Sequence, residues 1–285
     1  NAFQTTLKDG WYFSIFLIFI KDFLLHIGKG ACIIVRILQN LKQPEAQTAM
    51  PEIILRNHST SMQINTLGAY VDNLVLYGRE VLFPKTSAQV GTDKNYAADA
   101  RLTAQFGPDG KNHLAQHGFG RTSTWEIRYQ NESDVGLRLI SAAKGYENVE
   151  WLLDYSLPNE NEAVAALTVC NYGDVPVRTS PGFHPYFPAV GTQFDFNGAP
   201  YDADYIAHTE FVASPSDTHV AFDGLKLDIR TQNLPVYALW SDRNGQYTCA
   251  EPTAEGNAFL SPARGGQFVS GHGKKHYGMK IRLIA

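Results

Sequence analysis

The sequence predicts an all-β protein built as a large antiparallel β-sandwich, on three observations. Apolar and polar residues alternate with a period of two in many short runs after residue 52, as expected of strands that bury one face. Turn residues interrupt these runs at short intervals, and no segment after residue 52 keeps a 3.6-residue period over three turns. Many short strands joined by frequent turns are typical of a sandwich or barrel.

The strands are predicted from alternating runs. Four runs show the alternation most clearly, through apolar residues of one parity: Trp125, Ile127 and Tyr129; Trp151, Leu153, Tyr155 and Leu157; Leu167 and Val169; and Met279, Ile281 and Leu283. Each run is predicted to turn one face to a core and the other to water or a ligand. Turns are predicted at Asn57-His58-Ser59, Tyr77-Gly78, Pro158-Asn159, Tyr172-Gly173-Asp174 and Arg243-Asn244-Gly245, the last because Asn-Gly favours a tight hairpin.

The composition limits the class of protein. The chain has 285 residues, 44% hydrophobic and 18% charged, which supplies enough apolar side chains for one large core. The formal net charge is −4 and Lys and Arg are scattered, so no nucleic-acid groove is predicted. Cys32, Cys170 and Cys249 lie far apart without a C-x-x-C motif, which favours reduced thiols and a cytoplasmic location.

The first part of the chain differs from the rest. Residues 11–20 are almost wholly apolar, and a second apolar stretch over 23–38 is interrupted by charge. Neither reaches the roughly 20 consecutive apolar residues of a membrane span. Because Met50 directly precedes the first clean strand pattern, we expect residues 1–49 to be an extension outside the functional protein and 52–285 to form the sandwich domain. Membrane attachment through residues 11–38 is the alternative.

Three clusters could carry chemistry: Gln116-His117-Gly118-Phe119-Gly120-Arg121, Pro181-Gly182-Phe183-His184-Pro185-Tyr186-Phe187 and Cys249-Ala250-Glu251-Pro252-Thr253. His184 lies among aromatic and proline neighbours, which stiffen the backbone and partly dry an acid or base. Glu251 follows an apparent strand over 246–250, from which a carboxylate can project into a cleft. Each also has a structural interpretation: a hydrogen-bonded histidine, a solvated glutamate, an Arg121 paired with Glu126. Local patterns do not decide between them.

In combination, the clusters resemble the aldose 1-epimerases of the galactose mutarotase-like superfamily and the related hexose-6-phosphate 1-epimerases. The resemblance covers about residues 52–285. It begins with Leu67-Gly68-Ala69-Tyr70 through Gly78-Arg79-Glu80-Val81-Leu82, and includes Gln116 to Arg121 with Trp125. It continues through His184-Pro185-Tyr186-Phe187 and ends with Glu251-Pro252 and the strand over 277–284.

The resemblance implies a twisted super-sandwich with a sugar cleft on its concave face, and it implies roles. His184 matches the general acid that protonates the ring oxygen, and Glu251 the general base that takes the anomeric proton. Gln116, His117 and Arg121 match sugar-binding positions. No metal or nucleotide cofactor is implied. His272 and His276 have H-x-x-x-H spacing, but they lie in a Gly-Lys-rich loop without partner ligands, so no metal site is predicted there.

One departure bears on the substrate. The hexose-6-phosphate relatives carry Arg-Gly-Gly before Phe-Gly-Pro, whereas this chain has Tyr96-Ala97-Ala98 before Phe106-Gly107-Pro108. Tyrosine is a weak substitute for a guanidinium at a phosphate, and Arg101 stands at a different spacing. A free hexose is therefore the predicted substrate. Glucose 6-phosphate and a non-catalytic carbohydrate-binding sandwich are the alternatives. Asp202, Asp204 and Asp242 are equal candidates for a further acidic sugar ligand.

Overall fold

A computed structural model describes residues 52–83, 101–103, 117–140, 143–189, 191, 193–202, 205–214, 216–222, 224–241, 247–256 and 267–284. Antiparallel sheets dominate these residues, and the predicted all-β sandwich is confirmed. The predicted extension over 1–49 lies outside the described residues. In the part of the chain that is described, no helix is long and apolar enough to cross a membrane. The cytoplasmic location stays a prediction.

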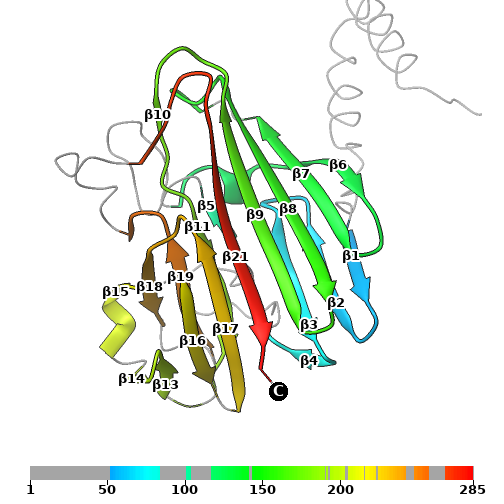
Figure 1. Ribbon diagram of the computed structural model, residues 1–285, viewed down its shortest axis with the longest axis vertical. Helices are drawn as coiled ribbons and strands as arrows, with labels where there is room; N and C mark the ends of the chain where they lie inside the picture. The colour runs from blue at the N-terminus through cyan, green and yellow to red at the C-terminus, as the bar shows by residue number, and fades with distance from the viewer. Residues whose placement is uncertain are drawn as a thin grey trace, which may run out of the picture. The chain divides into compact units, whose positions relative to one another are not determined.

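The largest sheet has nine strands in the order β14-β13-β16-β17-β21-β9-β8-β7-β6. Their bounds are β6 Glu126–Gln130, β7 Asp134–Ile140, β8 Val149–Asn159, β9 Glu162–Asn171, β13 Gln193–Phe196, β14 Ala199–Asp202, β16 Asp217–Phe222, β17 Leu225–Gln232 and β21 Lys274–Leu283. Buried and exposed residues alternate along β8 and β9, as their sequence predicts. The strand β21, latest in the chain, lies in the middle of the sheet between β17 and β9 (Figure 1).

Three further sheets and two short 3-10 helices complete the described part. A four-stranded sheet contains β1 Glu52–Asn57, β2 Thr60–Asn65, β3 Tyr70–Leu76 and β4 Arg79–Glu80. A six-stranded sheet contains β5 Arg101–Thr103, β11 Gly182–His184, β12 Tyr186–Pro188, β15 Glu210–Ala213, β18 Val236–Trp240 and β19 Tyr247–Thr253. β10 Val177–Arg178 pairs with β20 Phe268–Val269, and the 3-10 helices are η1 Gly120–Thr122 and η2 Tyr205–His208.

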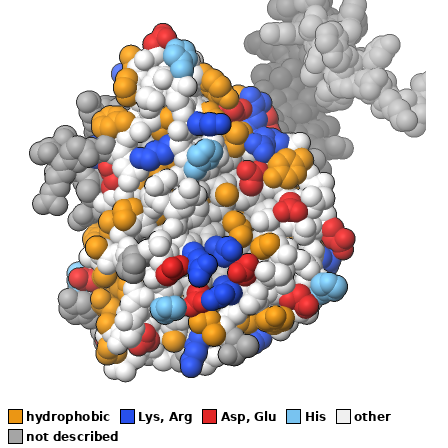
Figure 2. Space-filling view, viewed as in Figure 1, with side chains coloured by type: hydrophobic (Ala, Val, Ile, Leu, Met, Phe, Trp, Pro, Cys, Tyr) orange, Lys and Arg blue, Asp and Glu red, His pale blue; other side chains and the backbone are white. Residues whose placement is uncertain are grey.

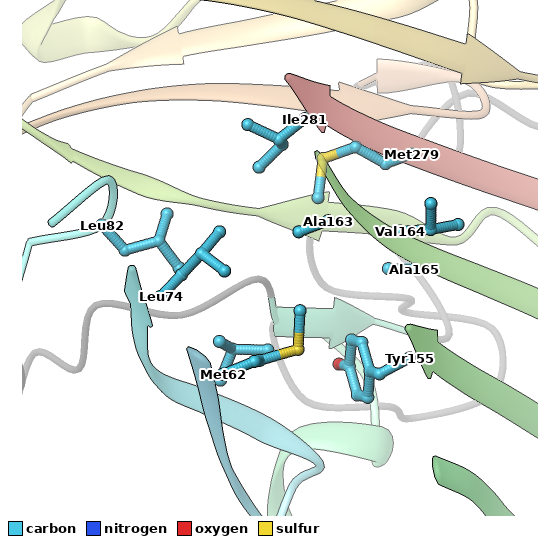
Figure 3. Close-up of a pocket in the computed structure, with 10 residues that line it drawn as sticks. Met62, Leu74, Leu82, Tyr155, Ala163, Val164, Ala165, Met279 and Ile281 are labelled. Carbon is cyan, nitrogen blue, oxygen red and sulfur yellow. The ribbon is translucent and has the colours of Figure 1, made fainter. Parts of the chain in front are cut away.

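The four-stranded sheet packs against the β8 and β9 half of the large sheet, and an apolar cavity marks the layer between them. Met62, Leu74 and Leu82 line it from one side, and Ala163 and Met279 from the other (Figure 3). Tyr155 also lines this cavity, and its hydroxyl donates a hydrogen bond to the Ala69 carbonyl at 2.8 Å. This space is core between two sheets, and its lining offers little chemistry.

The six-stranded sheet packs against the other half of the large sheet through aromatic rings. Phe187 of β12 stacks on Phe222 of β16 with ring centroids 5.1 Å apart. Tyr237 of β18 lies edge-on to Phe196 of β13 at 5.1 Å. Successive strand residues point to opposite faces, so these contacts fix which face of β12 and β18 is turned to the core. The neighbouring parity, which includes Tyr186 and Trp240, occupies the opposite face.

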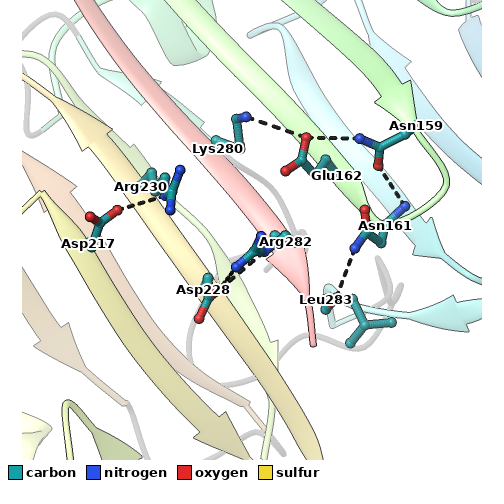
Figure 4. Close-up of polar contacts among 9 residues, drawn as sticks. All are labelled: Asn159, Asn161, Glu162, Asp217, Asp228, Arg230, Lys280, Arg282 and Leu283. Carbon is teal, nitrogen blue, oxygen red and sulfur yellow. Dashed lines mark hydrogen bonds and ion pairs between the residues drawn. The ribbon is translucent and has the colours of Figure 1, made fainter. Parts of the chain in front are cut away.

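The outer face of the large sheet carries charged side chains that pair across neighbouring strands. Lys and Arg side chains gather with acidic ones over the middle of the face shown in Figure 2. Asp228 of β17 accepts hydrogen bonds from Arg282 of β21, and Arg230 pairs with Asp217 at 2.8 Å (Figure 4). Lys280 contacts Glu162 at 3.4 Å in the same view. Cross-strand pairs of opposite charge contribute to the stability of a solvated sheet face.

Two predictions about strands are wrong in detail. Ile127 and Tyr129 are 42% and 44% exposed and do not face a core, because β6 is an edge strand and a register shift between them interrupts the alternation. Pro158-Asn159 lies at the end of β8, one step before the turn. The turns at Asn57-His58-Ser59 and Tyr77-Gly78 are confirmed, with φ of +52° at His58 and +50° at Tyr77.

Candidate active site

The strand register brings His184 and Glu251 to the same place. Gly182 pairs with Thr253 and Tyr186 pairs with Cys249, so the same register carried through sets His184 opposite Glu251. Residues directly opposite each other in an antiparallel pair project from the same face. Two residues that are distant in the chain thus become cross-strand neighbours.

The two side chains are in contact and buried. The imidazole Nδ1 of His184 lies 3.5 Å from Oε1 of Glu251. His184 is 5% exposed and Glu251 2%. The expectation that Glu251 stands at a strand end is wrong, because all seven residues of β19 are buried and the strand continues past it to Thr253. A buried carboxylate beside an imidazole is arranged to exchange a proton with it or with a ligand that contacts both.

Aromatic rings surround the histidine on the face of the six-stranded sheet that is turned away from the large sheet. The Tyr186 ring stacks on His184 with a centroid distance of 4.7 Å and an interplanar angle of 3°. Trp240 lies edge-on to His184 at 6.2 Å. Tyr247 contacts Tyr186 at 5.0 Å and Phe83 at 5.3 Å. These rings hold the imidazole in one orientation and give the site flat apolar walls.

The first cluster reaches the same site through His117. Its ring lies edge-on to His184 with centroids 5.4 Å apart. The chain reverses sharply there, with φ of +64° at His117 and +69° at Gly118, a conformation that glycine adopts without strain. Phe119 anchors the reversal because its ring packs edge-on against Trp151 at 5.7 Å.

Arg121 follows His117 on η1, and the backbone of this segment is fixed by the four-stranded sheet. Tyr70 donates from its hydroxyl to the Arg121 carbonyl at 2.8 Å, and Gly68 donates from its N–H to the Ser123 carbonyl at 2.7 Å. The Nε1 of Trp125 donates to the Gly120 carbonyl at 3.0 Å. Arg121 itself is half-buried, and its sugar-binding role stays a prediction.

The approach to β11 is anchored to the large sheet. The hydroxyl groups of Thr179 and Tyr277 are hydrogen-bonded at 2.9 Å. Burial raises the pKa of Tyr277 to about 12, so the phenol stays neutral and the hydrogen bond persists at physiological pH. The segment that carries His184 therefore starts from a fixed point on β21.

The third residue of the cluster is Cys249, for which the sequence predicts only a reduced thiol. It is fully buried, and its sulfur lies within 4.8 Å of one ligand atom of His184 and one of Glu251. Cys249 precedes Glu251 by two residues, so both project from one face of β19. Had the strand been predicted to include Glu251, the two-residue spacing would have placed Cys249 on the same face. No local signal in the sequence points to Trp240 or Tyr247.

The other predicted residues lie elsewhere or are not described. Gln116, Asp204 and Asp242 lie outside the described residues, as does Tyr96, and Asp202 is half-buried on β14. The backbone of Arg101 pairs with that of His184 in the β5–β11 register. His272 and His276 are turned to separate partners, Asp174 at 2.8 Å and Thr168 at 2.9 Å.

Galactose mutarotase-like proteins are among the solved structures with this architecture. A galactose mutarotase related enzyme from Lactobacillus acidophilus has a TM-score of 0.68 at 15% identity, over 82% of this chain and 98% of that one. A galactose mutarotase-like protein from Lactobacillus casei has a TM-score of 0.70 at 16% identity, over 82% and 100%. A galactose 1-epimerase from Lactobacillus acidophilus has a TM-score of 0.57 at 15% identity, over 82% and 94%.

At such low identity these structural likenesses show the fold alone, and the family follows from the sequence. The family model of aldose 1-epimerases matches residues 51–244, which is more than half of the chain. No curated protein matches. The chain belongs to the aldose 1-epimerase family, whose members are epimerases that bind sugars.

Proposed function

We propose that this protein is a mutarotase that interconverts the α and β anomers of a free hexose. The observation that supports the proposal is the contact between His184 and Glu251, 3.5 Å apart on one buried sheet face. Ring opening needs one proton removed from the anomeric hydroxyl and one delivered to the ring oxygen. A base that reaches O1 and an acid that reaches O5 of the same sugar can do both in concert.

The proton and electron movements balance without a further reagent. The Glu251 carboxylate takes the proton of the anomeric O1 hydroxyl, and the O1 electrons form the C1=O1 double bond. The C1–O5 bond breaks, and O5 takes a proton from the His184 imidazolium. Rotation about C1–C2 presents the other face of the aldehyde. Closure then returns both protons, with the roles of the two residues exchanged.

The surrounding residues are assigned to binding. Tyr186 and Trp240 provide apolar ring faces beside His184, which suit the C–H faces of a pyranose and exclude water from the proton transfers. His117, beside His184, is proposed to donate to or accept from sugar hydroxyls. Gln116 and Arg121 are proposed as further sugar ligands on the family resemblance.

Polarimetry on freshly dissolved α-glucose and α-galactose tests the proposal. His184→Ala and Glu251→Gln are each expected to lower the catalysed rate by about 10²- to 10⁴-fold, the usual contribution of a general acid or base. His272→Ala and Glu126→Gln are matched controls, since both side chains are exposed and pair with other residues, Asp174 and Arg138. A wild-type rate in either site variant removes that residue from the mechanism.

A sugar phosphate is the second candidate because the backbone of Arg101 lies beside that of His184. An anomer-specific coupled assay on glucose 6-phosphate separates the two substrates. Faster interconversion of the phosphosugar than of free glucose or galactose would transfer the proposal to that substrate. Sugar binding without any change in the anomer ratio would support a non-catalytic carbohydrate-binding sandwich.

A further inference from the structure

The buried cluster of His184, Cys249 and Glu251 combines an imidazole, a thiol and a carboxylate, each with one ligand atom within 4.8 Å of the others. This set contains the three ligand types that Zn²⁺ accepts in proteins. Mg²⁺ and Ca²⁺ prefer all-oxygen shells. We propose that these three residues bind Zn²⁺, and that the bound ion inhibits the enzyme.

The distances suit a tetrahedral ion. Zn–N and Zn–O bonds of about 2.0–2.1 Å at a tetrahedral angle place the two donor atoms about 3.4 Å apart, and Nδ1 of His184 lies 3.5 Å from Oε1 of Glu251. With a Zn–S bond of about 2.3 Å, the sulfur belongs about 3.6 Å from each of them. One ligand atom of each residue lies within 4.8 Å of the others, so closing the three onto one ion requires side-chain movement on the order of 1 Å.

The backbone holds the three ligands on one rigid surface. Cys249 pairs with Tyr186 on one side and with Trp240 on the other, and Glu251 pairs with Ala238. The strand that supplies two ligands is thus fixed by hydrogen bonds along both edges. Ala238, which pairs with Glu251, presents only a methyl group and adds no competing ligand. Three protein ligands with one open position are typical of a zinc site that exchanges its fourth ligand.

The charges of the ligands also favour a divalent cation in this buried site. The Cys249 thiolate and the Glu251 carboxylate together neutralise Zn²⁺, so the loaded site carries no net charge. Burying a neutral cluster avoids most of the desolvation penalty of a charged one. Binding releases the thiol proton and, where His184 is an imidazolium, the proton of the nitrogen that takes the ion.

The inhibition rests on the proposed function, whereas the binding does not. A Zn²⁺ ion on His184 and Glu251 takes the lone pairs that would carry protons to and from the sugar. Mutarotation should therefore stop while the ion is bound and return when a chelator removes it.

Calorimetric titration of the whole chain with ZnCl₂ measures the binding, and Co²⁺ serves as the spectroscopic probe. We expect one ion per chain and a thiolate-to-cobalt charge-transfer band in the near ultraviolet. Cys249→Ser and Cys249→Ala should lose the band and weaken Zn²⁺ binding by at least about tenfold. Cys170→Ser and Cys32→Ser are the controls and should keep both, since Cys170 is the half-buried thiol of β9.

Each result decides a part of the proposal. A wild-type protein that binds no Zn²⁺, a Co²⁺ complex without a thiolate band, or Cys249 variants that bind as the wild type does would each overturn the site. Zn²⁺ bound through Cys249 with mutarotation unchanged would overturn the inhibition. If no mutarotase activity exists at all, the proposed function fails while the calorimetric and Co²⁺ measurements still decide the metal site.

Discussion

Trp125 and Trp151 offer a matched test of the contact that fixes the His117–Arg121 segment. Both indoles are buried, with 2% and 1% exposure. Trp125 donates from Nε1 to the Gly120 carbonyl at 3.0 Å, whereas Nε1 of Trp151 has no hydrogen-bond partner within the described part of the chain. Replacing either residue by Phe removes the same ring volume, so the two variants differ mainly in one hydrogen bond.

The magnitude follows from the two environments. The smaller ring costs both variants a similar amount, about 1–3 kcal/mol for a buried large-to-small change. Trp125→Phe also loses a hydrogen bond worth about 1 kcal/mol, although the Gly120 carbonyl keeps a 3.4 Å contact from the Ser123 N–H. Trp151→Phe removes a buried donor whose burial without a partner costs at least about 1 kcal/mol. Trp125→Phe should therefore be less stable than Trp151→Phe by about 2 kcal/mol.

Thermal unfolding followed by circular dichroism measures this difference. For a domain of this size, 2 kcal/mol corresponds to a Tm that is roughly 4–8 °C lower for Trp125→Phe than for Trp151→Phe. The near-ultraviolet circular dichroism spectrum of each variant, recorded at ambient temperature, is the control for native folding. Equal Tm values, or the reverse order, would refute the argument that the indole N–H anchors η1.

Two further predictions concern stability. Burial raises the pKa of Asp228, but hydrogen bonds from Arg282 and His219 outweigh it and leave the pKa below its ordinary value. The contribution of the ionised Asp228 to the free energy of unfolding is therefore present above pH about 4 and is lost as the pH falls through the lowered pKa. Urea denaturation should find Asp228→Asn about 1–3 kcal/mol less stable at neutral pH, with a difference that shrinks in acid, and a pH-independent difference would contradict this. An added methyl at Gly68, where φ is +76°, would lie 2.5 Å from a backbone carbonyl of η1, while one at Gly78, where φ is +70°, would meet nothing within 4 Å. Gly78→Ala should therefore cost only about 1–2 kcal/mol of strain and Gly68→Ala more, and equal losses of Tm would argue against the close packing.

The strands were predictable because alternation is a local property of the sequence. The apolar residues from Trp151 to Leu157 on β8 are all buried, as their parity predicts. The prediction failed at Ile127 and Tyr129 because an edge position and a bulge are properties of the sheet, which parity within one strand does not report.

The site was predictable in its members but not in its construction. His184 and Glu251 were joined by family resemblance, since nothing local relates two residues so distant in the chain. The physical reason for their contact is the β11–β12–β19 register. Because Glu251 was expected just after the end of a strand, the sequence did not indicate that it shares a strand face with Cys249. Trp240 enters through β18, a strand without a distinctive motif.

The central position of β21 has a consequence for synthesis of the chain. The strands β6 to β9 and the strands β13, β14, β16 and β17 can each form hairpins as they emerge from the ribosome, but in the nine-stranded sheet the two groups are joined through β21. Until β21 inserts, β9 and β17 each present a row of unpaired backbone groups, which is a template for pairing with other chains. Nascent or truncated chains that stop before Lys274 should therefore depend on chaperones or aggregate, even though most of the core residues have already been made.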